Sequence, residues 1–212
     1  MKINLKYKTT KEILIFSLLP FGMSTINSVI GTALNMYFTD VLGLSLAMTS
    51  IVLSATRIWD AVNDPIMGMI VDKTHTKWGK CRPYIFWMSF PVVIVTALLF
   101  APVNFGQNGN FIFAIIAYLI FYTGYTALDI PYQGLTPLVF PEDKKRVKAI
   151  SFSNILGSLG TVLPSILFFT IAGLWGREQQ KQGYFFAALI FAALGGIPMF
   201  FSGFGIKEKI YI

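Results

Sequence analysis

Cysteine, histidine and charged residues are scarce in this chain of 212 residues. The single cysteine, Cys81, excludes an intramolecular disulfide, and with His75 as the only histidine it is a poor basis for a zinc site. Charged residues make up 13% of the sequence, whereas soluble domains carry about 25%. This deficit argues against a water-soluble globular domain.

The signature motifs of nucleotide-binding and hydrolytic enzymes are missing as well. The only Gly-Lys pair is Gly79–Lys80, and Thr74 and Cys81 stand where a phosphate-binding loop needs a glycine and a serine or threonine. The sequence also has no dinucleotide fingerprint, HExxH pair or nucleophile elbow. We therefore expect neither an enzyme nor a bound cofactor, and active transport would have to draw on an ion gradient.

Long apolar runs, in contrast, are abundant. Hydrophobic residues make up 55% of the chain, and the mean hydropathy is +0.64. They gather in six blocks, at residues 13–38, 45–71, 84–103, 111–140, 149–174 and 184–204. Each block reaches the length of about 20 residues that a helix needs to cross a bilayer. The sequence thus predicts an all-α membrane protein in which residues 1–212 form one bundle of six transmembrane helices.

The basic N-terminus followed by an apolar run also invites comparison with a cleaved signal peptide. The run at residues 13–38 is much longer than the apolar core of a signal peptide, which has about 7–15 residues. No A-x-A-like cleavage site follows it. We therefore expect this run to remain as a membrane span.

Basic residues are distributed unequally between the two ends of the predicted helices. Only Arg177 and Lys181 fall at one end, and fourteen fall at the other. These fourteen are Lys2, Lys6, Lys8, Lys11, Lys73, Lys77, Lys80, Arg82, Lys144, Lys145, Arg146, Lys148, Lys207 and Lys209. Because basic loops stay in the cytoplasm, both termini are predicted to be cytoplasmic. This pattern accounts for the net charge of +7, and a nucleic-acid partner is not expected because no basic face is indicated.

The stretch RIWDAVNDPIMG, at residues 57–68, places charged side chains inside the second apolar block. Each such residue costs roughly 2.5–3.5 kcal/mol on insertion into a membrane. On a helix, Arg57, Asp60 and Asp64 fall within about 60° of one another, and Asn63 lies at the edge of the same face. Such a stripe must face the interior of the bundle or a water-filled cavity.

Two interpretations of this stripe remain open. In the first, Arg57 pairs with one carboxylate and the polar set only holds helices together. In the second, two acids against one base leave a surplus negative charge and an amide, and the stripe binds a cation. Oxygen-rich sites with surplus negative charge suit a hard cation such as Na⁺, or a proton.

A second polar segment, YTGYTALDIPYQG at residues 122–134, lies in the fourth block. Thr126 and Asp129 share a helix face there, and three tyrosines lie on or near it: Tyr122, Tyr125 and Tyr132. A carboxylate among aromatic rings can hold a sugar, since the acid accepts hydrogen bonds from hydroxyls while a ring covers the apolar face of the pyranose. Alternatively, the tyrosines belong to the aromatic belt at the membrane interface, and Asp129 packs helices together.

With these two segments and VDKTHTKWGKCRPY, at residues 71–84, the sequence resembles the glycoside–pentoside–hexuronide:cation symporter family. The spacing D-x3-D-P-x2-G-x3-D-x6-G-K, which runs from Asp60 to Lys80, is long and specific. Carriers of this family belong to the major facilitator superfamily and have two halves of six helices, of which this chain resembles the N-terminal half. The resemblance implies a sugar or glycoside substrate, a C-terminal half as partner, and the lipid bilayer of a bacterial inner membrane.

The resemblance also implies roles for individual residues. The coupling cation, which is Na⁺, Li⁺ or H⁺, would lie among Asp60, Asn63, Asp64 and Thr126. Arg57, which shares their helix face, is the predicted charge partner of these acids, and no metal beyond the coupling cation is expected. Asp129 would contact the sugar.

The sugar site departs from that of melibiose-type carriers in the family. Those carriers have an acid, a tryptophan and an arginine where this chain has Ser24, Gln133 and Asn154, so a pentoside, a hexuronide or another glycoside is as plausible as melibiose. With Tyr125 and Asp129, these three residues form the predicted sugar-binding set. The loop between the second and third helices would help to hold one conformation through Gly68, Asp72, Gly79 and Lys80.

A different class of function is the alternative to this interpretation. The same helices would suit a non-transporting membrane protein, either a truncated remnant of a carrier or an interaction protein. A parent gene that continues into six further helices would favour the transporter.

Overall fold

The computed structural model describes residues 2–176 and 178–208, with side chains from Thr10 onward. Its long helices are α1 (Lys2–Met36), α2 (Leu46–Asp72), α3 (Arg82–Leu99), α4 (Gly106–Val139), α5 (Asp143–Ala172) and α6 (Gln180–Gly205). A π-helical turn, η1 (Tyr37–Val41), continues α1, and a 3₁₀ turn, η2 (Gly173–Trp175), follows α5. The prediction of an all-helical fold is thereby confirmed.

Five segments of the described chain are long and apolar enough to cross a membrane: Thr10–Val41, Arg82–Leu99, Gly106–Val139, Asp143–Trp175 and Gln180–Gly205. Helix α2 is not among them, although its 27 residues extend over about 40 Å. Its composition is the reason, because Arg57, Asp60 and Asp64 interrupt its apolar run. A sixth span through α2 therefore stays a prediction.

Several helices extend beyond the apolar blocks. Helix α1 begins at Lys2 rather than near residue 13, and α4 begins at Gly106 rather than near residue 111. The connection expected at residues 141–148 is largely helical, because α5 begins at Asp143. In its first turn Arg146 pairs with Asp143. Polar residues continue these helices past the apolar blocks, where hydropathy gives no signal.

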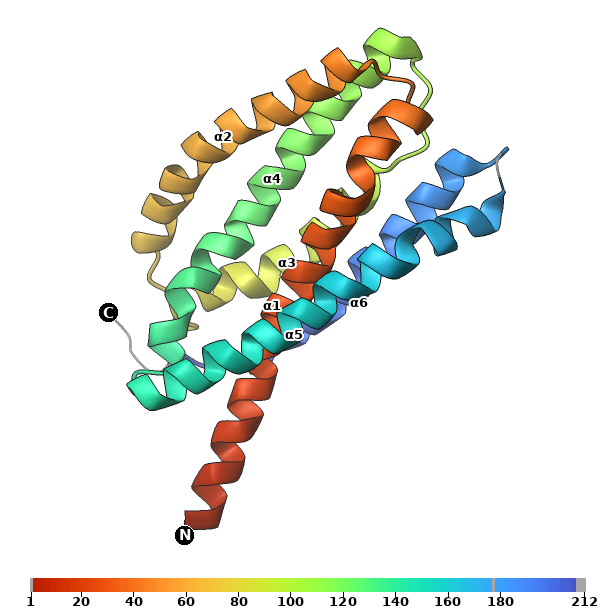
Figure 1. Cartoon of the computed structure of the whole chain (residues 1–212). Helices are drawn as coiled ribbons and strands as arrows, with labels where there is room; N and C mark the ends of the chain where they lie inside the picture. Colours follow the sequence, from red (N-terminus) through yellow and green to blue (C-terminus); the bar gives the residue numbers. More distant parts are fainter. Residues whose placement is uncertain (1, 177, 209–212) are drawn as a thin grey trace.

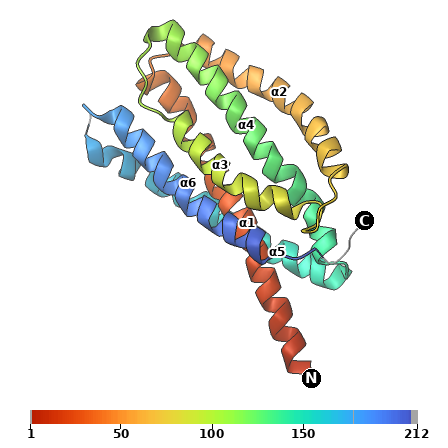
Figure 2. The ribbon, with the colours of Figure 1, turned by 180° about the vertical axis from the view of Figure 1, so that it is seen from behind.

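Helix α1 passes through the middle of the bundle, and α5 and α6 pack against it (Figure 1). Helix α3 packs against α6 and α4, whereas α2 lies along α4 at one edge (Figures 1 and 2). The order of packing is therefore α2, α4, α3, α6 and α1, with α5 covering α1 and α6. The edge position of α2 leaves one of its faces without a neighbouring helix.

Glycines bring α1 into direct contact with α5 and α6. A Cβ atom on Gly22 of α1 would lie 2.2 Å from the carbonyl oxygen of Gly195 in α6. A Cβ atom on Gly160 of α5 would lie 2.4 Å from the carbonyl oxygen of Phe21 in α1. Small residues at such crossings allow close van der Waals packing, which holds helices together in a membrane.

The two ends of the described chain and two connections lie at the same end of the molecule. The start of α1, the α2–α3 connection, the α4–α5 turn and the end of α6 are at the lower end of Figure 1. The prediction of six spans with both termini on one side requires such an arrangement. Arg177 and Lys209, which enter the charge asymmetry used to orient the chain, lie outside the described residues.

Candidate functional site

The polar stripe of the sequence lies in the middle of α2. Ser45 caps the start of this helix, because its side chain accepts a hydrogen bond from the Met48 backbone nitrogen at 3.2 Å. Pro65 directly follows Asp64, and since proline has no N–H, the Ala61 carbonyl loses its usual partner within the helix. Asp60 and Asp64 therefore lie next to a position where α2 lacks one backbone hydrogen bond.

Helices α2 and α4 meet through this stripe. The Thr126 hydroxyl of α4 donates a hydrogen bond to Asp64 Oδ1 of α2 at 3.1 Å. Asp60 lies close enough to the same hydroxyl to interact with it. One turn away, Trp59 Nε1 donates to Thr123 Oγ1 at 3.0 Å. The fold therefore brings together Asp60, Asp64 and Thr126, three of the four residues predicted to surround a cation.

Asn63, the fourth of these residues, has an unused hydrogen-bonding group. Its Nδ2 atom is buried and has no hydrogen-bond partner in the described part of the chain. A buried amide left in this way costs free energy unless a water, a substrate group or another chain pairs with it. The amide is therefore available to a bound molecule beside Asp60 and Asp64.

Arg57 does not form the ion pair that the first interpretation of the stripe requires. The ion pairs within the described residues are Lys80–Asp72, Lys145–Glu142 and Arg146–Asp143. Arg57 is near enough to act electrostatically on Asp60, but its side chain is exposed. The proposed charge partnership is thus a longer-range one, and it does not hold α2 to a neighbour.

The Arg57 side chain instead lines a pocket between α1, α2 and α4. The pocket has a volume of about 460 Å³, which is within the range of roughly 300–1,000 Å³ that is usual for small-molecule sites. It is lined by Asn27, Ile30, Gly31, Leu34, Asn35, Leu53, Ser54, Arg57, Tyr118 and Tyr122. Its amide, hydroxyl and guanidinium groups can all form hydrogen bonds with a polar ligand.

The asparagines of this pocket, Asn27 and Asn35, are not among the residues predicted from the sequence. Asn27, Gly31 and Asn35 are spaced by four residues along α1, so they lie on one face of that helix. Two amides at this spacing inside an apolar run are a detectable signal. It is weaker than that of the charged stripe at residues 57–64, because amides carry no charge.

The predicted sugar-binding residues fall into two groups. On α4, Asp129 is half-buried and accepts a hydrogen bond from Gln133 Nε2 at 2.8 Å, while Tyr125 lies one turn before it. Gln133 therefore occupies one lone pair of this carboxylate. Any sugar contact of Asp129 must use its remaining lone pairs.

The other group lies where α1 meets α5. Ser24 Oγ would be 3.2 Å from a Cβ atom on Gly157, so Ser24 faces α5. Asn154 is exposed on α5, one turn before Gly157. Next to it, the Ser153 and Ser17 hydroxyls are 2.9 Å apart and join the same two helices. Ser24 and Asn154 thus share one seam, whereas Asp129 and Gln133 belong to the α4 side.

Tyr132 is part of the helix packing. Its ring centroid lies 5.7 Å from that of Phe16 in α1, and Phe16 is fully buried. Tyr132 therefore contributes to the contact between α4 and α1, while Tyr122 faces the pocket.

The predicted gating residues are split between a helix and a loop. Gly68 lies inside α2, and Asp72 is the last residue of that helix. Lys80 Nζ lies 2.5 Å from Asp72 Oδ1, so an ion pair spans the α2–α3 loop. Gly79 has a positive φ of 109°, a conformation that favours glycine. The loop is thus a defined turn in which Asp72, Gly79 and Lys80 have separate roles.

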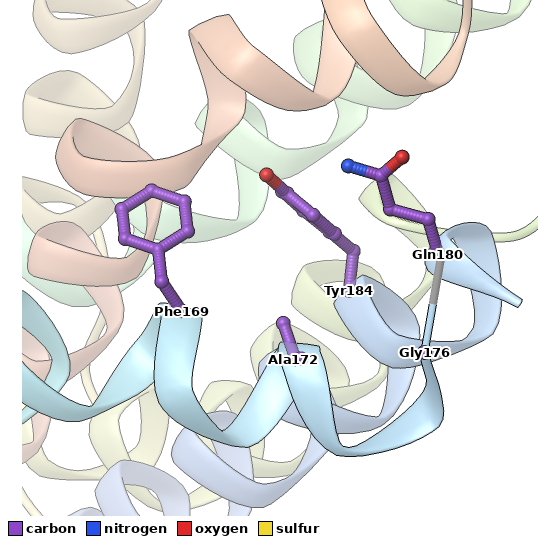
Figure 3. A pocket seen from close by; sticks show the side chains of 6 residues that line it. Phe169, Ala172, Gly176, Gln180 and Tyr184 are labelled. Carbon is purple, nitrogen blue, oxygen red and sulfur yellow. The ribbon is translucent and has the colours of Figure 1, made fainter.

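A further pocket, of about 390 Å³, lies where α5 turns into α6 (Figure 3). Tyr184 and Gln180 of α6 face it, and Phe169 and Ala172 of α5 line its other side (Figure 3). These side chains offer hydrogen-bonding groups, and none of the described residues that line the pocket is charged.

No set of three or more Asp, Glu, His or Cys side chains converges as a metal site within the residues described. The α2–α4 contact offers a set of oxygens instead, from the carboxylates of Asp60 and Asp64 and the hydroxyl of Thr126. Oxygen ligands of this kind are those that hard cations take.

Comparison with known proteins identifies the family. Residues 15–212 match the family model described as MFS/sugar transport protein. The chain is 28% identical to the isoprimeverose transporter of Lactiplantibacillus pentosus over 92% of its own length and 41% of that protein. It is 30% identical to a putative glycoside/cation symporter of Escherichia coli, covering 82% of the chain and 38% of the relative.

A glucuronide carrier protein homolog of Escherichia coli is 26% identical, again over 82% of the chain and 38% of the relative. The chain therefore spans about two fifths of the length of these curated relatives. Together with the apolar helices, these matches place it in a cell membrane and in a family of transporters. The chain belongs to the MFS/sugar transport family.

Proposed function

We propose that this chain is the N-terminal half of a carrier that transports a sugar or glycoside together with Na⁺, Li⁺ or H⁺. The observation that carries the proposal is the hydrogen bond from Thr126 to Asp64, with Asp60 and the unpartnered Asn63 amide beside it. Membrane proteins rarely keep charges of this kind without using them for transport or proton relay.

The cation is proposed to lie between α2 and α4. Asp60 and Asp64 bring negative charge, and Thr126 and Asn63 can contribute neutral oxygens. A bound cation would offset the repulsion between the two carboxylates, and the sugar-competent conformation would then bind the ion more tightly. Such coupling is reciprocal, so the sugar must also raise the affinity for the ion.

The sugar is proposed to lie within reach of both the pocket and Asp129. Arg57, Asn27 and Asn35 can donate to sugar oxygens, and Asp129 can accept from sugar hydroxyls. The relatives named for isoprimeverose and a glucuronide suggest one neutral and one acidic sugar as first candidates.

The half-carrier proposal includes α2 as a sixth span and cytoplasmic ends. The chain covers only about two fifths of its relatives, and substrates of such carriers bind near the midplane between two repeat units. A facing half would supply groups opposite α2 and α4. A truncated remnant or an interaction protein is the alternative, and it predicts no ion-dependent sugar binding.

Uptake into membrane vesicles tests the proposal. Vesicles from cells that express the whole gene should accumulate one of the labelled sugars faster under an inward gradient of Na⁺, Li⁺ or H⁺. Asp64→Asn should remove the stimulation by the ion, because the carboxylate that Thr126 contacts is lost. Asp143→Asn, which changes a surface ion pair in α5, is the matched control and should transport normally.

Saturable sugar uptake that responds to no ion gradient would reject the coupling. Absence of uptake for neutral and acidic sugars alike would reject the transporter and favour the remnant. If residues 1–212 alone carried out gradient-driven uptake in liposomes, the half-carrier part of the proposal would be wrong.

A further inference from the structure

Glu208, just after α6, is a buried carboxylate that contacts the start of α3. Its side chain is only 4% exposed. It accepts hydrogen bonds from three consecutive backbone nitrogens, those of Lys80 at 2.9 Å, Cys81 at 2.8 Å and Arg82 at 2.8 Å. The first N–H groups of a helix lack partners within it and carry partial positive charge. Glu208 therefore caps α3 from more than a hundred residues away in sequence.

The turn before α3 is shaped to admit this carboxylate. A Cβ atom on Gly79 would lie 2.3 Å from Glu208 Cδ and 2.5 Å from both of its carboxylate oxygens. The φ angle of +109° at Gly79 also disfavours any residue with a side chain. Gly79 is thus required twice, once for the backbone conformation and once for the space that Glu208 fills.

Arg82 returns the contact from α3 to α6. Its Nε donates to the Gly203 carbonyl at 3.0 Å, and its Nη2 donates to the Phe204 carbonyl at 2.6 Å. These carbonyls belong to the last turn of α6, where helices have unpaired acceptors. The Arg82 guanidinium also lies over the Trp78 ring, 5.5 Å from its centroid. Unpaired backbone groups at the start of α3 and at the end of α6 therefore receive hydrogen bonds from side chains at the opposite helix end.

The same loop also forms an ion pair with the C-terminal end of α2. Lys80, whose backbone nitrogen binds Glu208, places its Nζ atom 2.5 Å from Asp72 at the end of α2. Elsewhere α2 packs against α4 and η1, at the edge of the bundle. Glu208 thus fixes the α2–α3 loop, which joins the C-terminal end of α2 to α3 and contacts α6.

From these contacts we propose that Glu208 is a positioning residue of the transport cycle. Its carboxylate holds the α2–α3 loop against α6. Through Lys80 and Asp72, this contact sets the position of the C-terminal end of α2, the helix that carries Asp60 and Asp64. Glu208 itself contacts neither of those acids nor the pocket. This role rests on the proposed transport function, and it predicts a lower transport rate with unchanged ligand affinity when the carboxylate is lost.

Cys81 is a natural reporter of the contact. It is 1% exposed, and burial, assisted by the nearby negative charge of Glu208, raises the pKa of its thiol to about 12. In the wild-type membrane protein its reaction with N-ethylmaleimide should be slow. Glu208→Gln should accelerate labelling about tenfold or more, as the loss of even one charge-assisted hydrogen bond would allow.

Glu208→Gln also removes a charge that raises the thiol pKa, so a second variant is needed. Gly79→Ala displaces the carboxylate but keeps its charge, and it should accelerate labelling as well. Gly43→Ala is the matched control, since Gly43 has a φ of +71° but open space around its Cβ position. Lys207→Gln, beside Glu208 but exposed, controls for the site of mutation. Acceleration in Glu208→Gln alone would mean that only the charge changed, and the positioning role would fall.

Transport kinetics separate positioning from simple stability. In correctly folded Glu208→Gln carrier, the maximal uptake rate should fall about tenfold, while the dissociation constants of sugar and ion stay at wild-type values. A parallel loss of affinity, rate and folded protein would assign Glu208 a purely structural role and overturn the proposal. Absence of uptake by the wild type would instead refute the transport function, whereas the Cys81 labelling would still measure the loop contact.

Discussion

Thr126 of α4 donates a hydrogen bond to Asp64 of α2 at 3.1 Å, although the two residues are 62 positions apart in the sequence. A hydroxyl has one proton to donate and lone pairs that accept. When its proton points at Asp64, the lone pairs of Thr126 remain free for a cation. One side chain can thus orient a carboxylate and serve as a ligand beside it.

This geometry predicts the effect of removing the hydroxyl. Thr126→Val keeps the shape of the side chain but loses both the donor and the lone pairs, so the affinity for the coupling cation should fall about tenfold. Thr126→Ser should restore most of it. The concentration of Na⁺, Li⁺ or H⁺ that half-maximally stimulates sugar binding is the measurement. Thr123→Val, which removes the partner of Trp59 one turn away, is the control; an equal loss there would point to weakened helix packing.

Asp129 offers a second prediction. Asp129→Asn keeps the size of the side chain but loses the charge, and charge-assisted hydrogen bonds are about twice as strong as neutral ones. Sugar affinity should therefore fall strongly, whereas cation affinity in the absence of sugar should persist. Gln133→Ala, which removes the hydrogen bond that Asp129 receives, tests whether that bond matters. Unchanged sugar affinity in the Asp129→Asn carrier would return this residue to a packing role.

The orientation of the chain is testable with single cysteines. In a Cys81→Ser background, cysteines in place of Gln107 at the start of α4 and Gln179 before α6 should react with an impermeant thiol reagent added outside cells. A cysteine in place of Thr76 in the α2–α3 loop should not. All three native residues are exposed, so access depends on the side of the membrane. The reverse pattern of labelling would contradict the predicted cytoplasmic termini.

The glycine contact between α1 and α6 predicts a loss of stability. Gly22→Ala puts a methyl group 2.2 Å from the Gly195 carbonyl oxygen, and overpacking of this kind costs roughly 1–3 kcal/mol. Gly31→Ala on the same helix meets open space and should be neutral or stabilising by up to about 1 kcal/mol. Thermal unfolding in detergent measures both. Equal melting temperatures for the two variants would show that the helices shift apart without cost.

The sequence was a good guide to the number of helices and a poor one to their ends. Apolar runs marked the six long helices because the bilayer demands them, yet Lys2 and Asp143 begin helices in polar sequence. Hydropathy also separates α2 from the other five helices. The charged residues that are proposed to bind a cation lower the mean hydropathy of this helix.

Periodicity predicted which side chains share a face but not which faces meet. Asp60 and Asp64 followed from helical spacing, whereas their approach to Thr126 depends on how α2 packs along α4. Glu208 escaped notice for the same reason. It is one acid in a basic tail, and only the fold brings it to Lys80, 128 positions away.

The glycine seams have a mechanical consequence for the whole chain. Where backbones touch without an intervening layer of side chains, as at Gly22 and Gly160, no rotamer change can let the helices slide. Helices α1, α5 and α6 should therefore behave as a stiff block. The boundary between α1 and the α2–α4 pair has an open pocket instead of such a seam. We expect flexing within this chain to concentrate there, so the pocket that Arg57 lines should change width when α2 and α4 hinge against that block.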